Sequence, residues 1–264
     1  MQGDNLRDWQ DMPECGTPWP GSIFSFPQGN STWEPEWDIA KPNVCLFAQS
    51  GQEDLESMGP EMAFAKALIA GNASQRVGFV PVTWGGSSLF GEWSDSRRGL
   101  LATLLNQVHL AMAQAGPHAA LRGMVWVQGE GDATIVAGRT HAAMYGVHME
   151  RLIGTVRAEL SAYHPQLPFI MAVQSTTGRD RVLPFIDLVR RHQLALEMPG
   201  LLKVDMEGLE MLADDFTEMY GSDVGVQRLH VTKRAMCTFG DAMAGVYLAA
   251  RKQLEQAHEW SSVS

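Results

Sequence analysis

The feature that most constrains the fold is an alternation of short apolar runs with longer amphipathic segments from residue 61 onward. The apolar runs predict buried strands over residues 77–82, 123–127, 168–173 and 201–204. The segments that precede and follow them predict helices over about 61–70, 100–115, 141–163, 182–196 and 232–255. Continuous apolar strands alternating with helices are typical of a parallel sheet that is covered on both faces. The sequence therefore predicts an α/β fold.

Residues 1–60 differ from the rest of the chain. They are rich in proline, glycine and tryptophan and show little periodicity. We therefore expect an irregular loop region, which is unusual in a compact domain unless it covers a site. Neither a repeat nor a linker interrupts residues 61–264, so the whole chain, 1–264, is interpreted as one domain with an alternating α/β core.

Composition excludes several classes of protein. The 30 acidic and 20 basic residues give a net charge of −10, which disfavours nucleic-acid binding. The densest basic cluster, 190–192, is expected on the solvent face of its helix. The three cysteines, Cys15, Cys45 and Cys237, are too few and scattered for a disulfide framework or zinc site, so isolated thiols are expected. No apolar run approaches the roughly 20 residues of a membrane span. No metal, cofactor or membrane partner is expected.

Informative residues follow the predicted strands. Ligands of parallel α/β sheets bind at the carboxyl ends of the strands. The first strand ends in a Gly-Gly-Ser-Ser turn, 85–88, whose backbone N–H groups can point at one oxygen atom. A tight turn without a ligand would use the same residues. His230 stands at the start of the last helix, at the same edge, and can act as a general base.

Gln128 and Glu130 flank a glycine directly after the second strand, so both can point into one cleft. A glutamine amide suits an oxyanion hole, and a glutamate carboxylate can orient a histidine. The alternative is an N-cap network for the next helix. An amide donor, a carboxylate and His230 at neighbouring strand ends together indicate acyl transfer, although this set lacks a nucleophile.

Several motifs occur in the order expected of one family. They are Gly-Pro-Glu-Met-Ala-Phe-Ala (59–65), Val-Gly-Phe-Val-Pro-Val (77–82), Gly-Gly-Ser-Ser (85–88) with Trp93, Trp-Val-Gln-Gly-Glu-Gly-Asp (126–132) and Leu-His (229–230). The chain resembles the sialate O-acetylesterase-like carbohydrate esterases, family six, of the SGNH or GDSL-like hydrolases. The resemblance implies a three-layer α/β/α, flavodoxin-like fold and removal of acetyl groups from sugars such as sialic acid or xylan units, without a cofactor.

The resemblance also implies roles for individual residues. His230 would take the proton of a nucleophilic serine, the Gly86 N–H and the Gln128 amide would hold the oxyanion, and Glu130 would support the site. Ser87, Trp126 and Asp132, which belong to the same motifs, are expected to contact the substrate. The family usually carries aspartate three residues before the histidine, where this chain has Gln227. Asp223 or Glu130 would have to replace that carboxylate.

The nucleophile raises a separate question. In the family it lies in a Gly-Gln-Ser-Asn-Met motif after the first strand, and Met1-Gln2-Gly3 resembles the end of that motif. We therefore expect a chain that begins just after the serine, lacks the first strand and has impaired activity. No signal peptide is visible, which taken alone indicates a cytoplasmic protein, but a truncated start would remove any such signal.

Three alternatives stay open. Residues 44–51 resemble a strand followed by a nucleophile turn, which would give Ser50 the role of the serine. That position leaves little room before Gly59 for the segment that normally intervenes. A non-catalytic carbohydrate-binding relative of the same fold is a second possibility, favoured by Gln227. A flavin- or nucleotide-binding protein is a weak third, because no phosphate-binding glycine loop follows a strand.

Overall fold

The core is built on both faces of β5 (Phe169–Val173), whose residues are all buried. A computed structural model describes residues 15, 19–26, 37–40, 59–94, 99–215 and 225–261. In it β5 pairs in parallel with β4 (Met124–Trp126) on one side and β6 (Leu201–Asp205) on the other. Phe169 and Met171 belong to one apolar cluster, whereas Ile170 and Ala172 belong to another. This alternation is the period of two that a strand buried on both faces requires.

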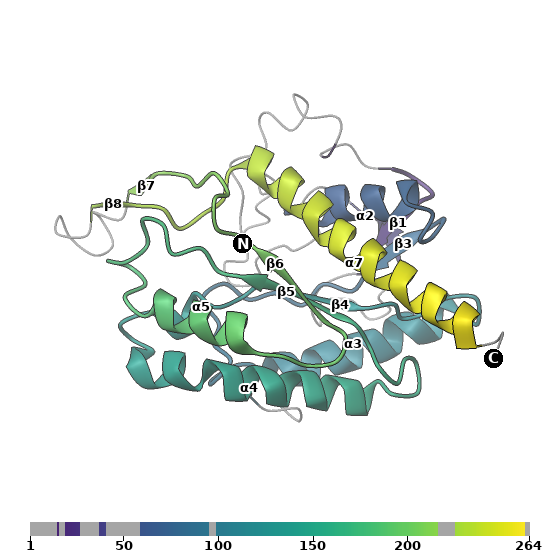
Figure 1. Ribbon diagram of the computed structural model, residues 1–264, viewed down its shortest axis with the longest axis horizontal. Coiled ribbons are helices and arrows are strands. Elements are labelled where there is room, and N and C mark those ends of the chain that lie inside the picture. The colour runs from purple at the N-terminus through teal and green to yellow at the C-terminus, as the bar shows by residue number, and fades with distance from the viewer. Residues whose placement is uncertain are drawn as a thin grey trace.

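Helices cover each face of this sheet (Figure 1). On one side lie α3 (Gly99–Ala115), α4 (Gly138–Glu159) and α5 (Ile186–Ala195), whose apolar faces enclose the first cluster. On the other side lie α2 (Glu61–Ala70) and α7 (Lys233–Ser261), which pack against each other and enclose the second cluster. The structure therefore confirms the expected three-layer α/β arrangement and each of the predicted helices, with ends shifted by a few residues.

The strands at the middle of the molecule are shorter than predicted. β3 (Val77–Phe79) pairs in parallel with β1 (Ile23–Ser25), and β1 pairs with β2 (Asp38–Ile39). Among the described residues, β3 and β4 are not hydrogen-bonded to each other, so the strands form two sheets, β2-β1-β3 and β4-β5-β6. Gly78 and Val125, at the centres of β3 and β4, are exposed, unlike every residue of β5. The contacts that hold the two sheets together must therefore lie elsewhere.

The expectation of an irregular region over residues 1–60 is wrong where β1 and β2 form. Ile23 is fully buried, and it lies with Met62 and Ala65 of α2 in a third, small apolar cluster. The short apolar run that forms β1 has no helical or alternating period of its own. Its pairing with β3, more than fifty residues away, makes it a strand.

The cysteines were also misjudged. Cys15 and Cys237 form a disulfide with a Cα–Cα distance of 5.7 Å, and both are buried, Cys237 within the first turns of α7. Their separation of 222 residues hides the pairing in the sequence. Cys45 lies outside the described residues. The basic cluster on α5 also differs from expectation, since Arg190 is bonded to Asp205 at 2.6 Å and to the Gln174 carbonyl at 2.8 Å.

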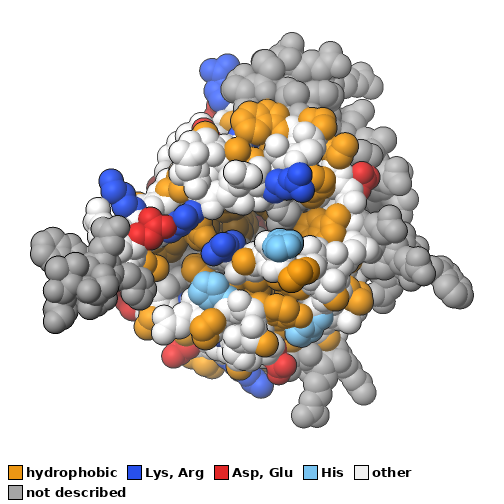
Figure 2. All heavy atoms as spheres, turned by 90° about the vertical axis from the view of Figure 1, so that its right-hand side faces the viewer, with side chains coloured by type: hydrophobic (Ala, Val, Ile, Leu, Met, Phe, Trp, Pro, Cys, Tyr) orange, Lys and Arg blue, Asp and Glu red, His pale blue; other side chains and the backbone are white. Residues whose placement is uncertain are grey.

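The two edges of the sheet have different surfaces. The amino ends of β4, β5 and β6 lie on the side seen in Figure 2, where apolar, basic and histidine side chains are mixed and the surface is hollowed near its centre. The carboxyl ends lie on the opposite side, beside the antiparallel pair β7 (Asp214–Asp215) and β8 (Val226–Gln227). No helix in the described ranges is long and apolar enough to cross a membrane.

Candidate active site

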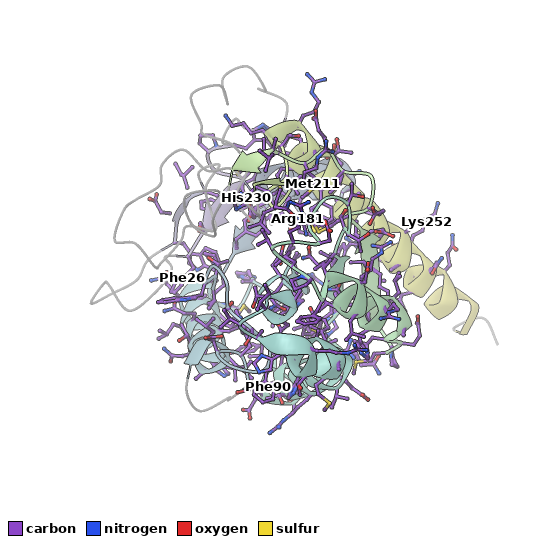
Figure 3. The ribbon with its side chains drawn as sticks, turned by 90° about the vertical axis from the view of Figure 1, so that its left-hand side faces the viewer. Phe26, Phe90, Arg181, Met211, His230 and Lys252 are labelled. Carbon is purple, nitrogen blue, oxygen red and sulfur yellow. A yellow bond between two sulfur atoms is a disulfide. The ribbon has the colours of Figure 1, made fainter. Side chains whose placement is uncertain are left out.

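Three segments meet at the carboxyl edge of the sheet, where the sequence predicted a site. They are the loop after β3, residues 83–94, the turn after β4, residues 128–133, and the segment 225–232 that leads into α7. Figure 3 views this edge, with His230, Arg181 and Met211 grouped on one side and Phe90 of the loop after β3 on another. His230 is partly exposed, as a general base must be.

The loop after β3 is shaped by its own side chains. Gly86 has a φ of +71°, a conformation that glycine adopts without strain. The Ser87 hydroxyl donates to the Trp84 carbonyl at 2.7 Å and accepts from the Trp93 indole at 3.0 Å. Ser87 is therefore buried and engaged within the loop, where it supports the turn, and its expected contact with a substrate stays a prediction. A Cβ added at Gly86 would meet no atom of the described residues within 4 Å.

Gly131 brings the turn after β4 against this loop. A Cβ at Gly131 would overlap the carbonyl oxygens of Gly86 and Ser87, so only glycine permits the approach. A Cβ added at Gly129, whose φ is +154°, would lie 2.8 Å from the Gln174 side chain and 3.1 Å from the Gln193 side chain. Both glycine positions of the Gln-Gly-Glu-Gly motif require glycine because neighbouring atoms leave no room for a side chain.

Asp132 joins the two loops by hydrogen bonds. It is fully buried, and its carboxylate accepts from the backbone N–H of Leu89 at 2.9 Å, from that of Phe90 at 3.4 Å and from the Gln128 amide at 2.6 Å. Burial raises the pKa of Asp132, and the hydrogen bonds oppose this rise only in part. Asp132 thus connects the two loops from the interior, and its expected contact with a substrate stays a prediction.

The Gln128 amide is hydrogen-bonded inside the protein. Its Nε2 atom donates to Asp132 and to the Ser87 carbonyl at 2.9 Å, so both amide hydrogens are used inside the protein. The Oε1 atom is buried and has no hydrogen-bond partner. In this geometry both amide hydrogens of Gln128 are engaged within the protein, and its expected role as an oxyanion donor stays a prediction, as does that of the Gly86 N–H.

Trp126 also lies in the interior, not in contact with solvent. It packs edge-to-face on Trp93, with ring centroids 4.8 Å apart, and its indole donates to the Tyr145 hydroxyl at 3.4 Å. Tyr145 in turn donates to the Gln128 carbonyl at 3.0 Å, and the Gln193 amide donates to the same carbonyl at 3.0 Å. Burial raises the pKa of Tyr145, so its hydroxyl keeps its proton. Sequence reasoning missed Tyr145 and Gln193, because each is a single polar residue on a long helix.

The loop after β5 is hydrogen-bonded to the segment before His230. The guanidinium of Arg179 donates to the carbonyls of Arg228 at 3.0 Å and Leu229 at 2.7 Å. It also lies 3.9 Å from the Glu130 carboxylate, which links the turn after β4 to the histidine segment. Gln227, at the position where the family carries aspartate, is buried, and its side-chain oxygen Oε1 accepts from the backbone N–H of Arg181 at 3.3 Å.

Two predicted residues lie outside the described ranges, namely Ser50 and Asp223. Within those ranges, no group of three or more His, Cys, Asp or Glu side chains is arranged to hold a metal ion.

The helices on both faces of a parallel sheet, with His230 at its carboxyl edge, define a three-layer α/β domain (Figure 1 and Figure 3). Residues 1–249 match the family described as carbohydrate esterase, sialic acid-specific acetylesterase. The chain belongs to this family, and it is a carbohydrate O-acetylesterase-type hydrolase domain.

Two solved structures are similar to the chain. A protein from Arabidopsis thaliana shares 28% identity over 90% of this chain and 84% of its own, with a TM-score of 0.68. NanS shares 17% identity over 97% of this chain and 92% of its own, with a TM-score of 0.64, which supports the fold. A search of curated proteins found no match.

Proposed function

We propose that this chain carries the histidine, oxyanion and supporting parts of an esterase site that removes O-acetyl groups from sugars, with acetylated sialic acids as the first substrates to test. The observation that carries the proposal is the joining of three loops at one edge. Gly131 and Asp132 fasten the Gly86 turn to the turn after β4, and Arg179 fastens the His230 segment to the same place. Family membership supplies the substrate class.

The proposed chemistry divides the work among a few groups. A serine hydroxyl attacks the acetyl carbonyl while His230 takes its proton, and the Gly86 N–H stabilises the oxyanion that forms. The protonated His230 then gives the proton to the departing sugar oxygen. Water, activated by the same histidine, hydrolyses the acetyl-enzyme and releases acetate. One oxyanion donor contributes about 3 kcal/mol to such a transition state.

Glu130 has a supporting place in this proposal. Its carboxylate is about one-quarter exposed and lies beside the buried Arg179 guanidinium. It therefore balances the charge under the His230 segment. Gln128 keeps a structural part, since its amide hydrogens hold Asp132 and Ser87.

The experiment measures acetate release from O-acetylated sialic acid, from acetylated xylan and from p-nitrophenyl acetate by the purified chain. Any hydrolysis by the chain should be lost in His230→Ala and kept in His118→Ala, which changes an exposed histidine in the turn between α3 and β4. Hydrolysis that survives His230→Ala would sink the proposal. Saturable binding of the sugar without any turnover would favour the non-catalytic carbohydrate-binding alternative.

The nucleophile is tested with Ser50→Ala, because Gln49-Ser50-Gly51 follows an apolar run. Loss of hydrolysis together with retained sugar binding would assign the nucleophile to Ser50. Unchanged hydrolysis would exclude Ser50 and require another serine.

A further inference from the structure

Arg179 is a fully buried arginine in the loop after β5, and it makes its hydrogen bonds at the candidate site. Its Nε and Nη2 atoms donate to the carbonyls of Arg228 and Leu229, the two residues directly before His230. Its Nη1 atom donates to the Gln174 side chain at 2.7 Å. One planar group thus spans two consecutive peptide carbonyls and the end of β5, a geometry suited to the fork of a guanidinium.

Burying this charge is costly. The desolvation penalty of an ion inside a protein amounts to several kcal/mol even after relaxation. The Glu130 carboxylate lies 3.9 Å from Nη1, a longer distance than a hydrogen-bonded ion pair would show. The Arg228 and Leu229 carbonyls contribute to the compensation, and they can do so only while the segment before His230 keeps its position.

The backbone around His230 is fixed from the other side as well. The His230 carbonyl accepts from the Leu212 N–H at 2.8 Å, and Val231 forms a β-bridge with Met211. The Arg228 N–H donates to the Gly178 carbonyl at 2.9 Å, one residue before Arg179. His230 is thus held between strand-like contacts on one side and the Arg179 loop on the other.

We propose that Arg179 is a positioning residue for His230. It sets the direction of the imidazole through the Arg228 and Leu229 carbonyls, and it couples that direction to Glu130. The catalytic consequence rests on the proposed function, whereas the positioning itself does not. Nothing in the sequence marks this residue, since it lies in a polar loop fifty positions before the carbonyls that it holds.

The test observes the imidazole directly. In protein labelled with ¹³C-histidine, the ε1 signals of the eight histidines are recorded, and the His230 signal is assigned by its loss in His230→Gln. Arg179→Lys keeps the charge but cannot bond both carbonyls and Gln174 together. We expect its His230 signal to shift or split into more than one conformation while most other histidine signals stay unchanged.

The matched control is Arg157→Lys. Arg157, in the last turn of α4, also donates to two main-chain carbonyls, those of Leu167 at 3.0 Å and Pro199 at 2.7 Å. Arg157→Lys should lower the free energy of unfolding and leave the His230 signal in place. If Arg179→Lys does not fold, Gln174→Met, which removes an acceptor of the same guanidinium, is measured in its place and should also shift the His230 signal.

Activity gives a second readout. If the chain hydrolyses p-nitrophenyl acetate, Arg179→Lys should lower kcat by up to ~100-fold with little change in KM, the effect expected when a catalytic group is displaced by about 1 Å. An unchanged His230 signal in a folded Arg179→Lys or Gln174→Met variant would overturn the positioning role. A shifted signal in a chain without hydrolysis would uphold positioning and contradict the proposed function alone.

Discussion

The Nε2 atom of Gln128 lies 2.6 Å from the Oδ2 atom of Asp132, four residues further along the turn after β4. This contact aims the carboxylate of Asp132 at the N–H groups of Leu89 and Phe90, in the loop after β3. Since β3 and β4 are not paired in the described part of the chain, these bonds connect the two sheets at the edge that carries the candidate site. The Gln-Gly-Glu-Gly-Asp motif therefore connects the two loops in addition to supplying polar groups.

The close contact between the two loops predicts a large loss of stability in Gly131→Ala. The added methyl group would meet backbone carbonyl oxygens, which cannot rotate away, so the two loops must separate. We expect a loss of about 1–3 kcal/mol in the free energy of unfolding, the usual cost of overpacking. Urea unfolding measures it. Gly154→Ala is the control, because a Cβ there meets no atom within 4 Å and favours the helix α4. Equal stability of the two variants would contradict this account of Gly131.

The buried Asp132 predicts a pH dependence of stability. Burial raises its pKa above the ordinary value of 3.8, so in the window between the two values the folded chain holds a proton that the unfolded chain has lost. The free energy of unfolding therefore falls as the pH rises from 3.8 through the raised pKa. Asp132→Asn removes this titration, and the slope in that window should become smaller. Urea unfolding at a series of pH values checks it.

Asp205 serves as the control of opposite sign for that experiment. The hydrogen bond from Arg190 lowers the pKa of Asp205, so its contribution to stability is present above the ordinary value and is lost as the pH falls through the lowered one. Asp205→Asn should leave the slope above 3.8 unchanged. The same slope in wild type and Asp132→Asn would show that Asp132 titrates normally.

Because Cys15 and Cys237 form one disulfide, we expect the replacement of either cysteine to lower stability as much as the replacement of both. The bond closes a loop of more than two hundred residues, and removing a native disulfide typically costs about 2–5 kcal/mol. Cys15→Ser, Cys237→Ser and the double variant should therefore lose the same amount in the free energy of unfolding, instead of adding their losses. Thermal unfolding with and without a reductant provides a second measurement. A double variant much less stable than either single one would contradict the pairing.

Much of the fold could be predicted from the sequence because its elements are local. The helix over residues 61–70 was predicted at the bounds that it has in the structure, since Pro60 and Gly71 mark its ends and its apolar face has a helical period. The buried strand β5 was recognisable from six consecutive apolar residues. β1 was missed because a run of three residues becomes a strand only through its partner β3.

The candidate site also has features that could be predicted from the sequence and features that could not. The order of the motifs was enough to predict that Gly86, Glu130 and His230 lie at one edge, because parallel strands share a carboxyl edge. The motifs could not reveal that Ser87, Trp126 and Asp132 are buried, and the expected contacts of these residues with a substrate stay predictions. Each is a polar or amphipathic residue that would suit a substrate equally well, but the packing of two loops encloses all three.

The sequence by itself thus determined the α/β alternation, the strand ends that carry polar groups and the motifs of the family. Only the tertiary structure decided that the amide of Gln128 donates to the Ser87 carbonyl, that Arg179 supports the segment of His230, and that Cys15 pairs with Cys237. The physical reason is distance along the chain. These contacts join residues 41, 50 and 222 positions apart, and no local propensity or period records which groups meet when the layers close.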